Sequence, residues 1–350
     1  MAKNVPFSAA RNEKALSGPA QIGPKQRLGS RAYLPHHSPS IEADVEGVEL
    51  HVTGPRQHSQ RAEISAEVEC VCAARCILGE GCCWDPRSQK VFWVDIKGGN
   101  LHALSPQSGD YQVWSLPCRI GSIAIPPPHW YPPNDSDGDR FLACGDLGLA
   151  WLGLQGTKVD IVTIAHPEAH LLENRFNDGK IGLDGRYWAG TMHDLETRIS
   201  GTLYAFSSNG DVALMDSGYR VPNGPAFSPD GRTVYHTDSA LQTVYAFDLE
   251  PDGQIRNKRV FVQYQPGEGY PDGMTTDANG KLWIAMWDGF RIEEISPHGE
   301  RIGYIKLPTP RVTSCTFMGE DETVMYATSA RLGLSETDRL AGGFFKVRLP

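Results

Sequence analysis

The sequence lacks the features that would tie it to a membrane or to nucleic acid. No apolar run in its 350 residues approaches the roughly 20 residues that cross a bilayer, and the N-terminus has no apolar core of a secretory signal. Basic residues are also in deficit, because 33 Lys and Arg stand against 42 Asp and Glu. Proteins that bind nucleic acid or anionic membranes need basic surface to neutralise phosphates. We therefore expect a cytoplasmic protein whose partner is a small molecule, not nucleic acid or a membrane.

Several common catalytic and metal-binding motifs are missing as well. The chain has no G-x-S-x-G nucleophile elbow, no G-x-x-x-x-G-K-[ST] phosphate loop and no H-E-x-x-H zinc helix. His166 and His170 lie four apart, but the Pro between them and a loop setting disfavour a zinc pair. Five of the eight cysteines lie within Cys70–Cys83, in neither a paired C-x2-C zinc pattern nor a small secreted framework. We interpret them as buried reduced thiols near the start of a strand, with a metal site as the alternative.

The first 67 residues differ in composition from the rest of the chain. They mix Pro, Ser, Gly, Gln and charged residues without helical or strand periodicity, so they bury too little apolar surface to fold alone. With 40% hydrophobic residues, 37 Gly and 25 Pro, the whole chain has material for a large core and for many turns between short elements. The sequence therefore predicts a flexible N-terminal extension over 1–67 and one all-β domain over 68–350.

Strand-like segments recur through the second part of the chain. Those that end in small or acidic residues are VFWVDI at 91–96, FLACGD at 141–146, YWAGTM at 187–192, VYHTD at 234–238, LWIAMWDG at 282–289 and VMYATSA at 324–330. They repeat at roughly 42–49 residues, each followed by a second alternating strand, as propeller blades do. A β-sandwich would lack this period, and a β-helix would have a shorter one. Six repeats predict a six-bladed β-propeller, in which neighbouring blades and ring closure cover the edges of each small sheet.

Short polar turns precede the first strand of several predicted blades. They read LGEG at 78–81, ENRFNDGK at 173–180, VPNG at 221–224 and YPDG at 270–273. Loops that enter the innermost strands of a propeller converge on its channel, so Glu80, Asn223 and Asp272 can meet there. Two carboxylates and one amide oxygen suit Ca²⁺, Mg²⁺ or Mn²⁺ and leave positions for water or substrate. Each dipeptide alone is more often a plain turn, but the shared Pro-x-Gly setting of Asn223 and Asp272 favours one site.

Together these segments resemble the senescence marker protein/gluconolactonase/luciferin-regenerating enzyme family of regucalcin-like sugar lactonases. The resemblance spans about residues 68–350 and rests on RCILGEG, WVDIKGGNLHAL, NRFNDGK with GRYWAGTM, VPNGPAFSPDGRTVY, YPDGMTTDANGKLWIA, and PRVTSCTF with YATSAR. It implies that Glu80, Asn223 and Asp272 hold one divalent metal ion. Ca²⁺ is the first expectation, and Zn²⁺, Mg²⁺, Mn²⁺ or Fe²⁺ are the alternatives.

The resemblance also implies a substrate and a mechanism. Arg175 and Asn177 would contact the lactone carbonyl and the sugar hydroxyls, and Asn174 and Asp178 are further candidates in the same loop. The metal would polarise the carbonyl of a glucono-, xylono- or arabinono-lactone, while Asp272 accepts a proton from the attacking water. The alternative is a non-catalytic calcium-binding propeller or a protein-interaction module. Oligomeric state is left open by the sequence.

Two positions depart from the family pattern. Relatives commonly read G-E-G-P where this chain has Cys82, so the turn that carries Glu80 loses a proline. Some animal relatives have a substrate-contacting Glu shortly after the G-T-M segment, where direct counting gives Leu195 here, with Glu196 one place further. Metal binding at Glu80 and substrate contact at Leu195 or Glu196 are therefore the points at which this chain is expected to differ.

Overall fold

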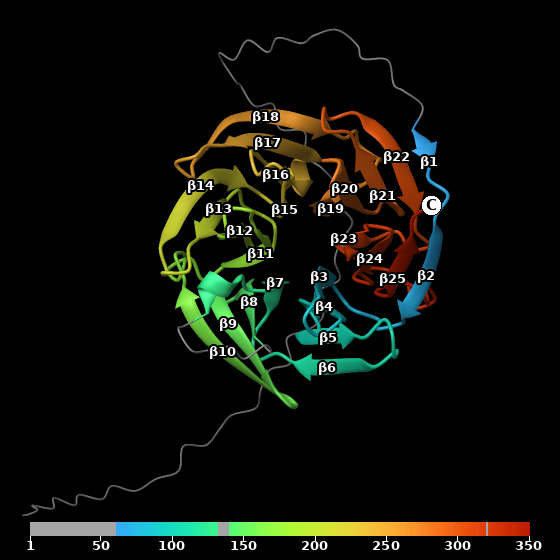
Figure 1. Cartoon of the computed structure of the whole chain (residues 1–350), viewed down its shortest axis with the longest axis horizontal. Helices are drawn as coiled ribbons and strands as arrows, with labels where there is room; N and C mark the ends of the chain where they lie inside the picture. The colour runs from blue at the N-terminus through green and yellow to red at the C-terminus, as the bar shows by residue number, and fades with distance from the viewer. Residues whose placement is uncertain (1–60, 132–139, 320) are drawn as a thin grey trace, which may run out of the picture. The chain divides into compact units, whose positions relative to one another are not determined.

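The computed structural model describes residues 61–131, 140–319 and 321–350, which form six small sheets arranged in a ring (Figure 1). The prediction of an all-β, six-bladed propeller is confirmed. Most of the segment expected to be a flexible extension, 1–67, lies outside the described residues. Within the described part of the chain the helical pieces are two 3-10 turns of three residues each, and no helix there is long and apolar enough to span a bilayer.

Each blade begins with an inner strand beside the centre of the ring (Figure 1). The inner strands are β3 (Gly79–Asp85), β7 (Ile120–Ala124), β11 (Asn174–Ile181), β15 (Pro222–Phe227), β19 (Tyr270–Thr276) and β23 (Val312–Met318). The second strands are β4 (Lys90–Asp95), β8 (Arg140–Gly145), β12 (Tyr187–His193), β16 (Thr233–Asp238), β20 (Leu282–Trp287) and β24 (Val324–Ser329). These second strands coincide with the six repeated segments of the sequence.

The strands that follow complete the blades. The third strands are β5 (Asn100–Leu104), β9 (Gly148–Gln155), β13 (Gly201–Phe206), β17 (Thr243–Leu249), β21 (Arg291–Ile295) and β25 (Phe344–Arg348). The outer strands are β6 (Tyr111–Ser115), β10 (Lys158–Ala165), β14 (Val212–Tyr219), β18 (Ile255–Gln263), β22 (Arg301–Lys306) and β2 (Glu67–Cys72). We number the blades one to six by their inner strands, from β3 to β23.

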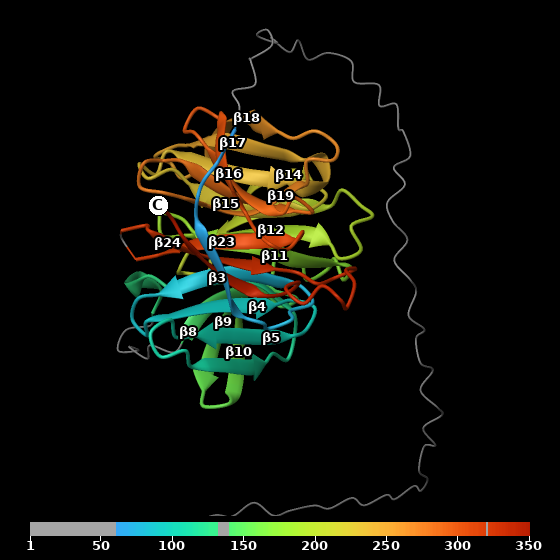
Figure 2. The same cartoon turned by 90° about the vertical axis from the view of Figure 1, so that its right-hand side faces the viewer.

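The ring is closed by a strand from the beginning of the domain. β2 pairs antiparallel with β25, with Val68 opposite Val347, so the sixth blade joins two distant parts of the chain. Just before it, β1 (Ala62–Glu63) pairs in parallel with β22 of the fifth blade. Both strands run along the outside of the ring (Figures 1 and 2). Described residues on the N-terminal side of position 68 therefore also contact the propeller.

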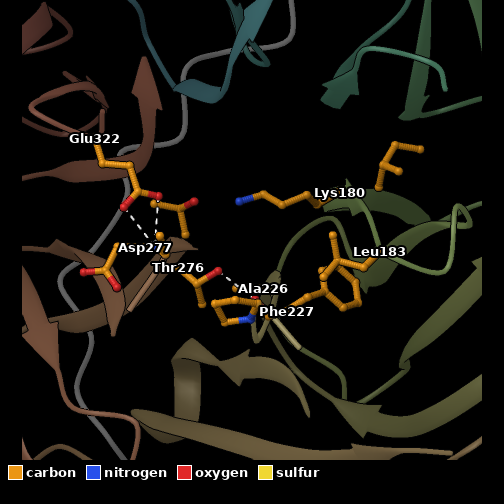
Figure 3. A pocket seen from close by; sticks show the side chains of 11 residues that line it. Lys180, Leu183, Ala226, Phe227, Thr276, Asp277 and Glu322 are labelled. Carbon is orange, nitrogen blue, oxygen red and sulfur yellow. Dashed lines mark hydrogen bonds between the residues drawn. The ribbon is translucent and has the colours of Figure 1, made fainter. Parts of the chain in front are cut away.

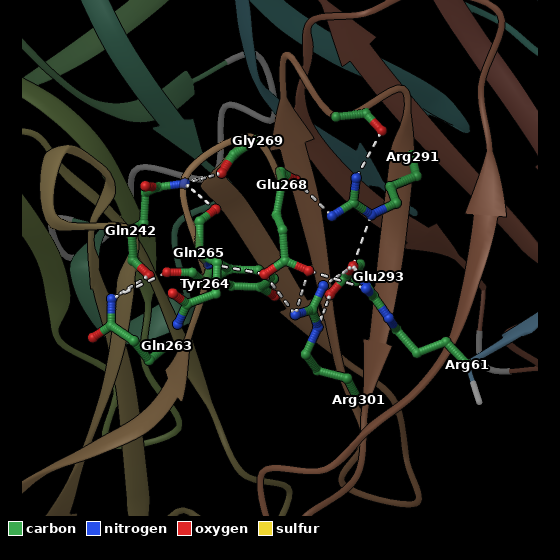
Figure 4. A network of polar contacts seen from close by, with 11 residues as sticks. Arg61, Gln242, Gln263, Tyr264, Gln265, Glu268, Gly269, Arg291, Glu293 and Arg301 are labelled. Atoms are coloured by element: carbon green, nitrogen blue, oxygen red, sulfur yellow. Dashed lines mark hydrogen bonds and ion pairs between the residues drawn. The ribbon is translucent and has the colours of Figure 1, made fainter. Parts of the chain in front are cut away.

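An ion-pair network holds the segment before β1 against the fifth blade (Figure 4). Arg61 donates to Glu293 at 2.6 Å and to Glu268 at 3.0 Å. The Glu293 side chain is fully buried and also accepts from Arg291 and Arg301. The arginine charges and hydrogen bonds lower the pKa of Glu293 although burial alone would raise it. This network anchors the entry of the chain at the edge of the ring.

Apolar side chains fill the space between neighbouring blades. The described residues form six apolar clusters, and each lies between two adjacent blades. Alternate side chains of one strand enter different clusters: Phe92 and Val94 pack toward the second blade, whereas Val91 and Trp93 pack toward the sixth. Because successive strand residues point to opposite faces, second strands that are covered by both neighbours read as nearly continuous apolar runs.

Each inner strand departs from regular pairing near its start. Its register with the second strand shifts between Glu80 and Cys83, Ile120 and Ser122, Phe176 and Gly179, Asn223 and Ala226, Pro271 and Met274, and Val312 and Ser314. Such bulges leave residues without a ladder partner and re-aim their side chains. Four of these shifts begin at or next to a predicted site residue, and the other two lie in β7 and β23.

Candidate functional site

The three predicted metal ligands lie near the beginnings of three inner strands. Glu80 is the second residue of β3, Asn223 the second of β15 and Asp272 the third of β19. All three are buried, with residue exposures of 6%, 4% and 5%. After Asn223 the backbone turns through Gly224 at a φ of 76°, a conformation that glycine adopts without strain. The sequence positions that looked like plain turns thus place polar side chains in the interior.

A chain of hydrogen bonds links residues of three blades. Arg175 donates from Nη1 to Asn177 Oδ1 at 2.7 Å, and Asn177 donates from Nδ2 to Asn223 Oδ1 at 2.8 Å. Asn223 in turn donates from Nδ2 to Ser239 Oγ at 2.8 Å, and this hydroxyl donates to the carbonyl of Pro271 at 2.5 Å. Pro271 immediately precedes the third predicted ligand. The structure therefore connects both predicted substrate-binding residues to Asn223, one of the three predicted metal ligands, and extends the chain to the residue before Asp272.

Three buried carboxyl groups, those of Glu80, Asp178 and Asp272, lie close enough to influence one another. Burial raises the pKa of Glu80, and the negative charges of Asp272 and Asp178 raise it further. Burial, followed by the charge of Asp178, likewise raises the pKa of Asp272. Burial also raises the pKa of Asp178 to about 6, although the ammonium of Lys180 opposes this shift. Like charges thus accumulate in a site with little counter-charge.

The hydrogen bonds that these carboxylates accept come from backbone groups. Gly81 N–H donates to Glu80 at 3.2 Å, and the N–H groups of Gly179 and Gly224 donate to Asp178 at 2.8 and 2.9 Å. Among the described residues no lysine or arginine forms an ion pair with any of the three. We call Glu80, Asp178, Asn223 and Asp272 the channel cluster. Buried charges are normally paired or bound to a metal, and an all-oxygen donor set of this kind fits a hard divalent cation.

Two other residues of strand β11, Arg175 and Asn174, lie in different hydrogen-bond networks. Arg175 is 5% exposed, and its Nε donates to Asp194 at 2.9 Å. Asn174 faces a separate network, in which it donates to Glu168 at 2.9 Å and accepts from Ser200 at 2.8 Å. Asn174 therefore lies in the packing beside β11, whereas Arg175, Asn177 and Asp178 belong to the site.

Sequence reasoning missed the residue that holds Arg175. Asp194 accepts from both Arg175 and Arg119, and these partners hold its pKa below the ordinary value although burial alone would raise it. A usable signal was present, because an Asp recurs at or just after the end of the second strand in several blades, as in Asp95 and Asp238. Ser239, which bridges Asn223 to the strand of Asp272, had no such signal.

The departures from the family pattern fall on opposite sides of the site. Leu195 is 64% exposed, whereas the charge of its neighbour Glu196 contributes to the raised pKa of Asp272. Glu196 therefore has the electrostatic contact with the channel cluster. Cys82 packs in the apolar cluster between the first and sixth blades, where its thiol contacts the carbonyl of Tyr326 at 3.7 Å. The thiol in place of proline thus fills apolar space between blades.

A cavity of about 250 Å³ opens at the other end of the inner strands (Figure 3). Its lining includes Lys180, Phe227 and Thr276, which lie near the ends of β11, β15 and β19. The hydroxyl of Thr276 donates to the carbonyl of Phe227 at 2.7 Å, and Lys180 donates to the carbonyl of Met274 at 2.7 Å. None of the residues of the channel cluster lines this cavity, so the candidate site belongs to the strand starts.

Comparison with known proteins agrees with this arrangement. The family model for the SMP-30/gluconolactonase/LRE-like region matches residues 78–331. The chain is 35% identical over 295 residues to regucalcin of Gallus gallus, covering 81% of this chain and 94% of that protein. It is 32% identical over 287 residues to the 6-deoxy-6-sulfogluconolactonase of Pseudomonas putida, with the same coverage.

Solved structures of similar fold belong to proteins with the same family names. The chain resembles a calcium-binding protein, regucalcin, from Agrobacterium tumefaciens, with a TM-score of 0.74 and 26% identity over 83% of this chain and 96% of that one. A luciferin-regenerating enzyme matches with a TM-score of 0.72 and 29% identity over 81% and 95%. The repeated strands, the six-bladed ring and these matches agree, and the chain belongs to the SMP-30/gluconolactonase/LRE-like family.

Proposed function

We propose that the chain is a metal-dependent lactonase that opens sugar-acid lactones of the glucono-, xylono- or arabinono-type to aldonic acids. The observation that supports this most is the channel cluster, in which buried carboxylates with no ion-pair partner among residues 61–131, 140–319 and 321–350 stand beside the Arg175–Asn177–Asn223 hydrogen bonds. The name of the Pseudomonas putida relative, a sulfogluconolactonase, supports a sugar lactone as the substrate class.

In this proposal Glu80, Asn223 and Asp272 hold one divalent cation, with Ca²⁺ as the first choice and Zn²⁺, Mg²⁺, Mn²⁺ or Fe²⁺ as alternatives. The cation supplies a Lewis acid for the lactone carbonyl and offsets the negative charge of the cluster. The Asn223 amide oxygen accepts one hydrogen bond from Asn177, so a second lone pair is left for the cation. Asp178 adds a nearby negative charge without being needed as a ligand.

The side chains of the site divide the remaining work. Asp272 accepts the proton of the attacking water, because a carboxylate beside the reacting carbonyl can act as a general base. Arg175 uses Nε and Nη1 for Asp194, Phe176 and Asn177. Its Nη2 donates to no described residue and is left for a substrate oxygen. The hydrogen bonds of Asn177 hold the side chains of Arg175 and Asn223 in fixed positions. The lactone is therefore oriented before the water attacks.

The proposal assigns the activity to one domain and one kind of partner. Residues 68–350 form the catalytic domain, and the described residues 61–67 pack against its outer edge. The partner is a small lactone in the cytoplasm, with no role for nucleic acid or a membrane. Regucalcin is the name of several relatives, and a propeller that binds calcium without turnover is the competing function.

A pH-stat assay separates the two functions. The purified chain is freed of metal with a chelator and supplied with Ca²⁺, Mg²⁺, Mn²⁺, Zn²⁺ or Fe²⁺ against a panel of aldonolactones. We expect turnover that disappears with the chelator and returns with at least one cation. Binding of Ca²⁺ measured by calorimetry, without turnover of any lactone, would overturn the enzymatic assignment and support the calcium-binding alternative.

A further inference from the structure

A second buried cluster of metal-ligating side chains lies outside the channel. Cys76 precedes β3, Asp95 ends β4 and His102 lies in β5. A sulfur, a carboxylate oxygen and an imidazole nitrogen from these residues all lie within 4.8 Å of one another, and each residue is at most 4% exposed. We call Cys76, Asp95 and His102 the seam cluster, because they lie where the first blade meets the sixth, beside the strand that closes the ring.

The sulfur and nitrogen of the seam cluster are separated as two ligands of one zinc ion would be. Cys76 Sγ lies 3.7 Å from His102 Nε2. Zinc bonds of about 2.3 Å to sulfur and about 2.0 Å to nitrogen at a tetrahedral angle give a ligand separation of about 3.5 Å. The observed distance therefore needs only a small adjustment to accept a zinc-sized ion between the two atoms.

The imidazole of His102 is held in a fixed orientation. Its Nδ1 lies 2.8 Å from the hydroxyl of Tyr111, and its ring stacks on Trp93 with centroids 5.1 Å apart and planes 8° apart. Trp93 is itself stacked on Phe344 of the sixth blade at 4.0 Å. Metal-bound histidines usually have the second ring nitrogen engaged in this way, which fixes the tautomer and directs the first nitrogen to the metal.

Asp95 anchors the loop that carries Cys76. Its Oδ1 accepts from Leu78 N–H at 3.0 Å and from Gly98 N–H at 2.8 Å, while Oδ2 accepts from Ile77 N–H at 2.8 Å. A carboxylate has about four lone-pair sites, so one on Oδ2 is left for a cation. Anchoring of this kind recurs elsewhere in the ring, whereas a cysteine and a histidine beside the Asp distinguish the first blade.

The equivalent Asp residues of other blades show which part of the cluster is special. Asp146 accepts from the N–H of Arg119, and Asp238 accepts from those of Arg220 and Val221. These carboxylates anchor the loops before their inner strands in the same way, but in the described part of the chain neither belongs to a group of three potential metal ligands such as Cys76, Asp95 and His102. The metal-binding inference therefore rests mainly on Cys76 and His102, with Asp95 as the third donor.

We propose that Cys76, His102 and Asp95 form a second metal site, which takes a thiophilic divalent cation of the zinc type and clamps the seam at which the ring closes. One imidazole, one thiolate and one carboxylate suit Zn²⁺ better than Ca²⁺, and the fourth position is left for water. Tyr111 is 43% exposed and contacts both His102 and the Cys72 thiol, so the cluster is connected to solvent through its outer side.

Proton release accompanies binding at this site. Burial lowers the pKa of His102 to about 4, so the imidazole is neutral at pH 7. Burial, and then the charge of Asp95, raises the pKa of Cys76 to about 12, so the sulfur carries a proton in the absence of a cation. The cation takes the place of that proton, which passes to the buffer, and binding strengthens as the pH rises.

The test uses the full chain, stripped of metal under reducing conditions and titrated with Co²⁺ as a coloured substitute for zinc. A cobalt–thiolate bond gives a near-ultraviolet charge-transfer band, which oxygen ligands do not produce. We expect Co²⁺, added until the channel cluster and the seam cluster are both saturated, to produce a band equivalent to one cobalt–thiolate site per chain, and Zn²⁺ to remove it. A folded wild-type chain without the band would overturn the proposal.

Matched variants locate the bound ion. Cys76→Ser and His102→Gln should both lose the band, whereas Cys118→Ser, which removes a half-buried thiol of the second blade, should retain it. If Cys76→Ser fails to fold, His102→Gln decides alone, because it leaves the thiol in place. Retention of the band in folded His102→Gln at unchanged affinity would overturn the assignment. Glu80→Gln should retain the band even where it abolishes lactone turnover, so the two proposals fail separately.

Discussion

The channel cluster and the seam cluster are both buried, but they stand in opposite electrostatic states. The channel cluster holds three carboxyl groups whose pKa values are raised by burial; the charges of Asp272 and Asp178 raise that of Glu80 further, and the charge of Asp178 raises that of Asp272 further. The seam cluster holds a neutral imidazole, a protonated thiol and one carboxylate that accepts three backbone N–H groups. A cation relieves repulsion in the first and replaces a proton in the second. Under the two proposals, a cation at the channel cluster offsets like charges, whereas a cation at the seam cluster competes with a proton.

The largest expected change in activity follows from removal of the proposed general base, Asp272. Asp272→Ala removes a ligand and the proton acceptor together, so kcat for aldonolactone hydrolysis should fall by at least the roughly 10²–10⁴-fold typical of a lost acid–base group. Initial rates in a pH-stat at saturating metal measure this. Asp160→Ala, on the exposed side of β10, is the matched control and should keep wild-type rates. A near-normal kcat in Asp272→Ala would remove the distinction between the clusters.

A smaller effect is expected at the seam. Tyr111→Phe removes the hydroxyl that lies 2.8 Å from His102 Nδ1, and loss of such a partner typically costs about 10–100-fold in metal affinity. Competition between the protein and a zinc indicator dye measures the change. Metal-activated lactone turnover should be unaffected, because Tyr111 lies on an outer strand. An unchanged zinc affinity would show that the hydroxyl does not support a metal ligand.

Asp194→Asn probes the support of the substrate-binding side of the channel. The variant keeps the shape of Asp194 but loses the charge that pairs with Arg175 and Arg119. We expect KM for aldonolactones to rise by roughly 10-fold, equivalent to about 1.5 kcal/mol for one charged hydrogen bond, with a smaller change in kcat. Steady-state kinetics provide the measurement. If only kcat changed, Asp194 would not act by orienting Arg175 toward the substrate.

The smallest effect concerns stability of the metal-free seam at acid pH. His102 has a pKa of about 4 in the folded chain against 6.5 for a free histidine, so the unfolded state binds more protons between these values and stability falls as the pH falls from 6.5 to 4. His102→Gln lacks this proton uptake. The drop in Tm between pH 7 and pH 4.5, measured with a chelator, should be smaller in the variant. Equal drops would contradict the burial of a neutral imidazole.

The regular parts of the fold were open to prediction from the chain alone. The second strands are buried along nearly their whole length and mostly apolar in their first residues because neighbouring blades cover both faces, and this made their period visible. Outer strands such as β14 and β18 alternate weakly and are largely exposed, so they left little pattern. The pairing of β2 with β25 was hidden for another reason, since it joins segments at opposite ends of the domain.

The candidate sites divide in the same way. The sequence pointed to Glu80, Asn223 and Asp272 because each stands in a short Gly-containing segment of recognisable composition, and the structure places all three near the starts of inner strands. Ser239 and Asp194 act through hydrogen bonds that form only when separate blades and strands meet. The spacing of Cys76 to its neighbouring cysteines gave no metal pattern, because the residues of the proposed seam site, Asp95 and His102, lie in the two strands that follow β3. Contacts between residues far apart in the sequence therefore complete the candidate sites, and local sequence patterns do not reveal these contacts.

The pairing of β2 with β25, which closes the ring, forms late in protein synthesis. During synthesis β2 emerges before any inner strand, yet its partner is made only after all six blades have been begun. Until then the growing chain carries an unpaired strand edge, which is a template for association with other chains. The thiols of Cys70 and Cys72 lie on β2, which has no partner strand during this interval. Newly made chains are thus most open to mispairing at this edge in the interval before the last blade is finished.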